Sequence, residues 1–160
     1  MKITISKAHE GHLEDCKDAL LYSKLGQEYF VTEEKALAAI TEGITKEEIF
    51  VAVNEDGECL GFIWFILKSA FHSFPYLHII AVKEAFRGMG IGKKLISFFE
   101  ETVFTENSKV FLVVADFNPD AKRLYESLGY HQVGVIPNLY KEGVTEHLMM
   151  KERNDLAKAR

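Results

Sequence analysis

Apolar and polar residues alternate along residues 2–6, which is the pattern of a β-strand with one buried face. In residues 9–25 the apolar positions instead recur at helical spacing. A second helix is expected from Thr32, a favoured N-cap residue, to Gly43, a residue type that often ends helices. The first part of the chain therefore predicts one strand followed by two helices.

Three strands are expected in the middle of the chain. Residues 49–53 are apolar, and residues 59–67 form a nearly continuous run rich in β-branched and aromatic side chains. Gly57 lies between them, where it can adopt the positive φ of a hairpin turn. A third apolar strand, residues 76–82, leads into a glycine-rich stretch and then into apolar positions at helical spacing up to residue 103. The pattern predicts a meander that ends in a helix.

Strands and helices alternate in the last third of the chain. An apolar strand at residues 110–115 precedes a helix at residues 120–128 that Gly129 closes. Residues 130–136 and 144–150 are expected to form an antiparallel pair. The whole pattern predicts an α/β fold with one mixed sheet and helices on both of its faces.

Composition narrows the classes of function. The chain has 160 residues, which fits one domain over residues 1–160, and its 48% apolar and 27% charged residues are ordinary for a soluble protein. The formal net charge of −5 argues against a nucleic-acid partner. The longest apolar run, residues 60–67, is too short to cross a bilayer, and the N-terminus lacks a signal-peptide core. We therefore expect a cytoplasmic protein with no nucleic-acid or membrane partner.

The cysteines and histidines argue against a metal site. Cys16 and Cys59 lie far apart in the sequence and lack metal-ligand spacing, and the six histidines form no metal-binding motif. We expect two reduced thiols and no metal.

The glycine-rich stretch is Arg87-Gly88-Met89-Gly90-Ile91-Gly92, between a strand and a helix. Its glycines let the backbone approach a ligand closely, the start of the helix favours an anion, and an arginine adds a charge that can grip phosphate. The spacing excludes two common nucleotide motifs, because Lys93 follows where a dinucleotide fingerprint needs glycine and the segment lacks the Ser or Thr of a P-loop. A pyrophosphate site and a glycine-rich turn without a ligand remain as alternatives.

Two segments resemble the signatures of the GCN5-related N-acetyltransferases, the GNAT family. Residues 87–92 are similar to the signature R/Q-x-x-G-x-G/A, and residues 118–130 closely resemble the second signature, N-x-x-A-x-x-L-Y-x-x-x-G-F/Y. The order of the expected elements over residues 1–151 is also similar to that of the family. The resemblance implies a GNAT-type acyl-CoA N-acyltransferase fold, a mixed sheet of about seven strands flanked by about four helices.

The resemblance also implies an activity. The chain would transfer an acetyl group from acetyl-CoA to a primary amine of an acceptor, by direct attack of the amine in a ternary complex. The alternative is a non-catalytic module of the same fold that binds an acyl-CoA as a sensor or an interaction partner.

In this family acetyl-CoA lies between two parallel strands that splay apart, here residues 76–82 and 110–115. By resemblance, backbone groups of Ile80, Ala81 and Val82 pair with the pantetheine arm, and one N–H polarises the thioester carbonyl. The pyrophosphate would lie on Arg87, Gly88, Met89, Gly90, Ile91, Gly92 and Lys93.

The second signature adds further cofactor contacts by resemblance. Asn118 would touch the pantetheine or order the site, and it is also a favoured helix N-cap. Ala121 and Lys122 would border the cofactor, where Lys122 either reaches the adenosine 3′-phosphate or lies on a solvated helix face.

Two residues are candidates for proton transfer. Tyr125 matches the family tyrosine that hands a proton to the departing thiolate, and the alternative is a tyrosine of the core. His78 would share a strand face with Ile80 and Val82, and it titrates near neutral pH as a general base should. A carboxylate or an ordered water is the alternative base, and a histidine of the core is the structural alternative.

The acceptor side is defined only by residue type. Aromatic residues with an acid nearby suit an amine with an apolar or cationic body, and they also suit simple packing. These residues are Tyr22, Glu28, Tyr29, Phe30, Pro137, Asn138, Leu139 and Tyr140, with His72, Ser73 and Tyr76 as weaker candidates. The resemblance also allows a homodimer, for which residues 144–150 would supply the pairing edge.

Overall fold

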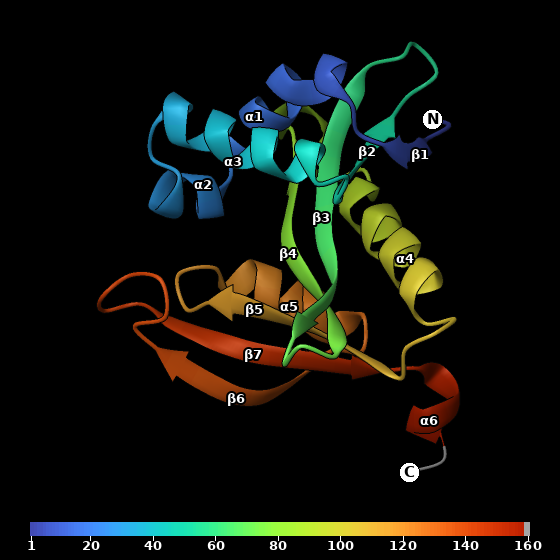
Figure 1. The fold of residues 1–160 in the computed structure, drawn as a ribbon, viewed down its shortest axis with the longest axis vertical. Helices are drawn as coiled ribbons and strands as arrows, with labels where there is room; N and C mark the ends of the chain where they lie inside the picture. The colour runs from blue at the N-terminus through green and yellow to red at the C-terminus, as the bar shows by residue number, and fades with distance from the viewer. Residues whose placement is uncertain (159–160) are drawn as a thin grey trace. The chain divides into compact units, whose positions relative to one another are not determined.

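The computed structural model describes residues 1–158, with side chains through Leu156. The chain forms two compact units, the first from Met1–Phe65 with Ile79–Thr102 and the second from Ile66–His78 with Val103–Arg160. Seven strands form one mixed sheet in the order β1-β2-β3-β4-β5-β7-β6, and the ribbon is drawn in Figure 1. The predicted α/β fold with one mixed sheet is confirmed.

The first unit contains most of the helices. Its elements, which include the parts of β3 and β4 that lie in this unit, are β1 (Thr4–Lys7), η1 (Glu10–His12), α1 (Leu13–Leu21), α2 (Lys24–Tyr29), α3 (Glu33–Thr45), β2 (Ile49–Val53), β3 (Cys59–Ala70), β4 (Phe74–Val82), η2 (Glu84–Phe86) and α4 (Ile91–Val103). Strand β2 pairs antiparallel with both β1 and β3. The hairpin turn between β2 and β3 has the expected positive φ at its glycine, +78° at Gly57.

Helices α3 and α4 cover opposite faces of the strands in the first unit. Ile49 pairs with Trp64, and Gly43 of α3 lies against both side chains. Phe50 points to the other face, where its ring lies 4.9 Å from that of Phe98 on α4. Figure 1 shows α3 and α4 on either side of β3.

Gly43 does not end α3, contrary to the prediction. The helix continues to Thr45, and Gly43 is buried. A Cβ atom at Gly43 would lie 2.5 Å from Cδ1 of Ile49 and 2.9 Å from Cε2 of Trp64. The glycine is therefore a point of close packing between helix and sheet, which sequence position alone does not reveal.

The single helix expected over residues 9–25 is also wrong. Helix α1 ends at Leu21, and Ser23 caps a separate helix α2 by accepting a hydrogen bond from the N–H of Gly26 at 2.9 Å. A Cβ atom at Gly26 would lie only 1.7 Å from the carbonyl oxygen of Leu20. The cap and the glycine together allow a tight turn, and they override the helical spacing of apolar residues.

The second unit adds two helices and three strands to the remaining parts of β3 and β4. These elements are β5 (Lys109–Ala115), α5 (Pro119–Ser127), β6 (His131–Pro137), β7 (Thr145–Glu152) and α6 (Asn154–Lys158). Strands β6 and β7 form the predicted antiparallel pair. With α2 and α6, residues 1–158 contain six α-helices rather than about four.

Strand β7 is not an edge, although residues 144–150 were expected to supply one. It pairs antiparallel with β5 on one side and with β6 on the other, so β6 is the outer strand. The side chains of Val133 and Val135 on β6 are 46% and 55% exposed. The pairing register of β6 shifts between Gln132 and Gly134, which is the mark of a β-bulge.

No helix in residues 1–158 is long and apolar enough to cross a membrane.

Two histidines cap the short helix η1, which precedes α1. Nδ1 of His9 accepts a hydrogen bond from the N–H of Gly11 at 3.0 Å, and Nδ1 of His12 accepts one from the N–H of His9 at 3.1 Å. Both bonds require an unprotonated nitrogen. Burial and the neighbouring His9 lower the pKa of His12, although Asp15 acts in the opposite direction.

We expect the free energy of unfolding to decrease as the pH falls from 8 through the ordinary histidine pKa of about 6.5. The unfolded chain takes up a proton at His12 more readily than the folded chain, because the folded pKa is the lower one. Urea unfolding of His12→Asn should show a smaller pH dependence than the parent protein. The exposed His131→Asn is the control, and equal pH dependence in His12→Asn and the parent would contradict this role.

Candidate active site

The predicted site residues divide between the two units. Residues 80–93 lie in the first unit, and the second unit carries His78, Asn118, Ala121, Lys122 and Tyr125.

The end of β4 is fixed by a close approach to β3. Burial alternates along β4, with His78, Ile80 and Val82 half-buried and Ala81 buried, as period-2 alternation predicts. A Cβ atom at Gly61 on β3 would lie 2.6 Å from the carbonyl oxygen of Ala81 and 2.9 Å from Cα of Val82. Only glycine allows this spacing without a shift of the backbone, so Gly61 determines where the strand end lies.

Two of the three glycines in the following loop set its backbone. Gly88 and Gly90 have φ values of +78° and +80°, which other residues adopt only at a cost. Gly92 lies in the first turn of α4, and a Cβ atom there would meet nothing within 4 Å. The first N–H groups of a helix have no partner within the helix. The loop therefore leaves open space beside N–H groups that favour an anion.

Arg87 ties this loop to its neighbours. Its Nε donates a hydrogen bond to the carbonyl of Val82 at 3.2 Å, and its Nη2 donates one to the carbonyl of Tyr22 at 3.0 Å. A guanidinium carries five N–H donors, and these bonds use two of them. Arg87 thus fixes the loop against the end of β4 and the end of α1, and its phosphate contact remains a prediction.

The electrostatics around the loop favour an anion. Residues 83–94 contain four basic side chains, Lys83, Arg87, Lys93 and Lys94, and one acidic side chain, Glu84, in a chain of net charge −5. Lys83 is paired with Asp15 of α1. Within the loop and the first turn of α4, the side chain of Ile91 is buried and that of Met89 is 56% exposed. A ligand at the helix start would therefore meet the backbone of Ile91 rather than its side chain.

In the second unit, β4 and β5 are parallel and pair at Tyr76 and Phe111. The ring of His78 lies 6.1 Å from the ring of Tyr76, between centroids. His78 is half-buried.

Helix α5 begins as the second signature suggests. The side chain of Asn118 caps it by accepting a hydrogen bond from the N–H of Ala121 at 3.4 Å, with a proline at the first helical position. Ala121 and Lys122 are half-buried. Gly129 follows the helix with a φ of +98°. The cap that the sequence offered as one role of Asn118 is present, and a cofactor contact remains a prediction.

Tyr125 is buried on α5, with 7% of its surface exposed. Its ring packs edge-on against Tyr130, with centroids 5.8 Å apart. Burial raises the pKa of Tyr125 above its ordinary value, so the phenol is protonated at neutral pH. Burial thus favours the neutral phenol, because loss of its proton would leave a buried anion.

Sequence reasoning missed Glu146 at the start of β7. Its side chain is buried, with 1% exposed, and its charge is among the causes that raise the pKa of Tyr76, after burial and Tyr140. The hydroxyls of Tyr76 and Tyr140 share a hydrogen bond of 3.3 Å. The sequence pattern does not mark Glu146, because its neighbours Thr145 and His147 are also polar.

Among residues 1–158, no group of three or more metal-ligating side chains is present. Cys16 and Cys59 are both free and buried. A hydrogen bond with Cys59, together with burial, raises the pKa of the Cys16 thiol. The two thiols are therefore neighbours despite their distance in the sequence.

A model of the acetyltransferase (GNAT) family matches residues 19–130. Thialysine N-epsilon-acetyltransferase of Sus scrofa is 33% identical over 145 residues, which cover 79% of this chain and 83% of that protein. N-alpha-acetyltransferase RimI of Mycobacterium tuberculosis is 29% identical over 108 residues, 66% of this chain and 67% of that protein. An uncharacterised protein of Mycobacterium leprae is 34% identical over 85 residues, 51% of this chain but only 23% of that protein.

Solved structures match nearly the whole chain. PH1933 from Pyrococcus horikoshii OT3 has a TM-score of 0.76 at 26% identity, covering 96% of this chain and 99% of that one. Ard1 from Thermoplasma volcanium has a TM-score of 0.76 at 25% identity, covering 95% of this chain and 98% of that one. These matches confirm the expected fold family.

Alanine at Gly92 tests whether the open space beside α4 receives a ligand. The free energy of unfolding of Gly92→Ala should stay unchanged or rise by up to about 1 kcal/mol, because alanine is the better helix former. Its affinity for acetyl-CoA should fall by about ten-fold or more, since the methyl group fills space that the ligand needs. Chemical unfolding and calorimetric titration measure the two effects.

Gly90→Ala is the contrasting variant for stability on the same loop. Its positive φ should cost about 1–2 kcal/mol of unfolding free energy. An unchanged acetyl-CoA affinity in Gly92→Ala would place the ligand elsewhere.

Proposed function

This chain belongs to the acetyltransferase (GNAT) family, and on that premise we propose that it transfers an acetyl group from acetyl-CoA to a primary amine. The amine attacks the thioester directly in a ternary complex, so no covalent enzyme intermediate forms. Two of the relatives are named as a thialysine N-epsilon-acetyltransferase and an N-alpha-acetyltransferase, which supports an amine acceptor.

The geometry of residues 87–92 is the observation that carries this proposal. Gly88 and Gly90 hold the backbone in positive φ, and Gly92 leaves open space at the start of α4. This arrangement, within a stretch of excess positive charge, fits the pyrophosphate of coenzyme A. The bound acetyl-CoA supplies the activated acetyl group.

The chain contributes binding and positioning on the cofactor side. Backbone N–H groups in the first turn of α4, including that of Lys93, bind the pyrophosphate. The remaining N–H donors of Arg87 add further hydrogen bonds. Backbone groups of Ile80, Ala81 and Val82 bind the pantetheine arm. One of these N–H groups stabilises the charge that develops on the thioester oxygen during attack.

Proton transfer is assigned to two side chains of the second unit. Tyr125 protonates the departing thiolate, a role supported by its match to the family signature. His78 accepts the proton of the attacking amine, which its half-buried position beside Tyr76 allows.

Release of free thiol from acetyl-CoA tests the activity. We expect amine-dependent release with at least one of thialysine, lysine, spermidine and a short peptide with a free N-terminus. Acetyl-CoA binding without thiol release across this panel would instead favour a non-catalytic acyl-CoA sensor.

Tyr125→Phe removes only a hydroxyl group. We expect kcat to fall by about a hundred-fold or more, because the leaving thiolate loses its proton donor, while the affinity for acetyl-CoA is retained. Tyr130→Phe is the control, since it removes a hydroxyl from the ring that packs on Tyr125. Equal kcat values for Tyr125→Phe and the parent protein would remove Tyr125 from the mechanism.

His78→Ala tests the base through the pH dependence of kcat/KM. A histidine base gives activity that rises with pH as the imidazole loses its proton, so this acidic limb should disappear or move in the variant. The exposed His131→Ala should keep the limb of the parent protein. An acidic limb retained in His78→Ala would assign the base to another group.

A further inference from the structure

Among residues 1–158, β1 is the outer strand at one end of the sheet and β6 is the outer strand at the other. A register shift interrupts the pairing of β6, but β1 pairs with β2 in unbroken register from Thr4, opposite Val53, to Lys7, opposite Phe50. An outer strand carries a row of N–H and C=O groups that no neighbouring strand uses. Of the two edges, β1 is therefore the one that offers a regular ladder to a further strand.

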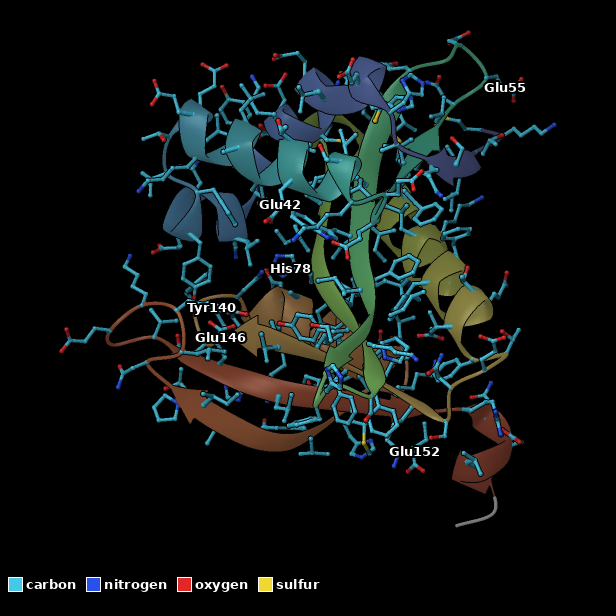
Figure 2. All side chains as sticks on the ribbon, in the orientation of Figure 1. Glu42, Glu55, His78, Tyr140, Glu146 and Glu152 are labelled. Carbon is cyan, nitrogen blue, oxygen red and sulfur yellow. The ribbon has the colours of Figure 1, made fainter. Side chains whose placement is uncertain are left out.

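Both ends of β1 are positioned by contacts with neighbouring turns. The N–H of Lys2 donates a hydrogen bond to Oε1 of Glu55 at 3.3 Å, and Figure 2 labels Glu55 in the turn between β2 and β3. At the other end, Nζ of Lys7 lies 3.7 Å from Oε1 of Glu47. These contacts lie within the first unit, so a partner would meet an edge that is already in place.

A groove of about 440 Å³ lies between residues 3–5 and α4. Its half-buried lining residues are apolar and its exposed ones are polar or charged. The apolar residues are Ile3, Ile5 and Phe98, and the others are Lys93, Lys94, Ser97 and Glu101. Lys93 and Glu101 are about 12 Å apart along the helix axis, a distance that four extended residues span at about 3.3 Å each. The groove therefore has the length of a short extended segment.

The charges in this groove favour an acidic ligand. The side chains of Lys93 and Lys94 form no ion pair within residues 1–156, although the chain has a net charge of −5. Glu101 is the one acid among the lining residues, and it lies about two helical turns from both lysines. One end of the groove therefore presents two ammonium groups that can pair with a carboxylate.

A second copy of β1 is poorly suited to the same edge. In antiparallel pairing about the centre of the strand, Lys2 of one copy would lie opposite Lys7 of the other. Equal charges directly opposite each other destabilise a pair of strands. An acidic segment would meet no such repulsion, so charge selects a different partner.

We propose that β1 and the groove beside it bind an extended acidic peptide segment of another protein, which adds to the sheet as a further strand. The backbone of the segment pairs with the outer edge of β1, and every second side chain faces the groove. An acidic side chain pairs with Lys93 and Lys94, and an apolar side chain two positions along packs on Ile5 and Phe98. This inference goes beyond the proposed acetyl transfer, and the binding can be measured without turnover.

Two pentapeptides with blocked ends test the site, Glu-Thr-Val-Thr-Val and its reverse, Val-Thr-Val-Thr-Glu. They cover both strand directions, and each presents its glutamate and valines on one face. Binding is measured by NMR shifts in excess coenzyme A, which keeps the glutamate out of the pyrophosphate site. At least one peptide should shift the amide signals of residues 3–7 and 93–101. The same peptide with Gln in place of Glu should bind about three-fold more weakly or worse, the size expected for exposed ion pairs.

Lys94→Gln should reduce the preference for the Glu peptide over the Gln peptide. Lys35→Gln is the matched control, because it removes an exposed lysine from α3, and it should keep the preference of the parent protein. N-methylation of alternate peptide residues tests the strand pairing, since alternate N–H groups face the neighbouring strand. One alternate set of methyl groups should abolish binding, and the other set should leave it unchanged.

Absence of binding by both peptides would overturn the inference, as would equal affinities for the Glu and Gln peptides or a preference unchanged in Lys94→Gln. Binding that neither set of N-methyl groups affects would reject the strand pairing. Shifts of residues 3–7 that grow with protein concentration in the absence of peptide would assign the edge to a second copy instead. Thiol release from acetyl-CoA is measured separately, so failure of this site and failure of the transferase remain distinguishable.

Discussion

The close approach of β3 to β4 at Gly61 is the constraint on which the first unit's chemistry depends. A side chain at Gly61 would collide with the backbone of Ala81 and Val82, so any larger residue must displace the end of β4. The N–H of Lys83 donates to the carbonyl of Leu60 at 2.8 Å, which continues the contact past the strand end. The glycine loop begins directly after this end of β4, so the position of the strand end determines where the loop starts.

Short-range patterns were sufficient for much of the fold. The positive φ at Gly57, the N-cap at Thr32 and the cap at Asn118 depend on residues within a few positions, and each is present as the sequence predicted. The glycine loop and Tyr125 were selected as candidates for the same reason, because each belongs to a contiguous signature. Local chemistry determines these features, so a single sequence can reveal them.

Features that depend on distant contacts were missed. Gly43 was interpreted as a helix end because its contacts with Ile49 and Trp64 become visible only when α3 packs on the sheet. The inner position of β7 depends on which strands it pairs with. The alternation of apolar and polar residues along a strand does not reveal the order of strands in the sheet. The burial of Glu146 was missed for this reason too, since it depends on how β7 pairs and packs in the folded chain.

The bulge in β6 affects how the molecule behaves in a crowded solution. An outer strand with exposed valines offers unpaired N–H and C=O groups to any passing chain, which is a common route to aggregation. The register shift between Gln132 and Gly134 interrupts this ladder and bends the strand, so a straight foreign strand can pair with only a few residues. A foreign strand that paired with β6 along its whole length would need a matching one-residue shift in its own register. This requirement excludes most sequences that would otherwise add to the sheet.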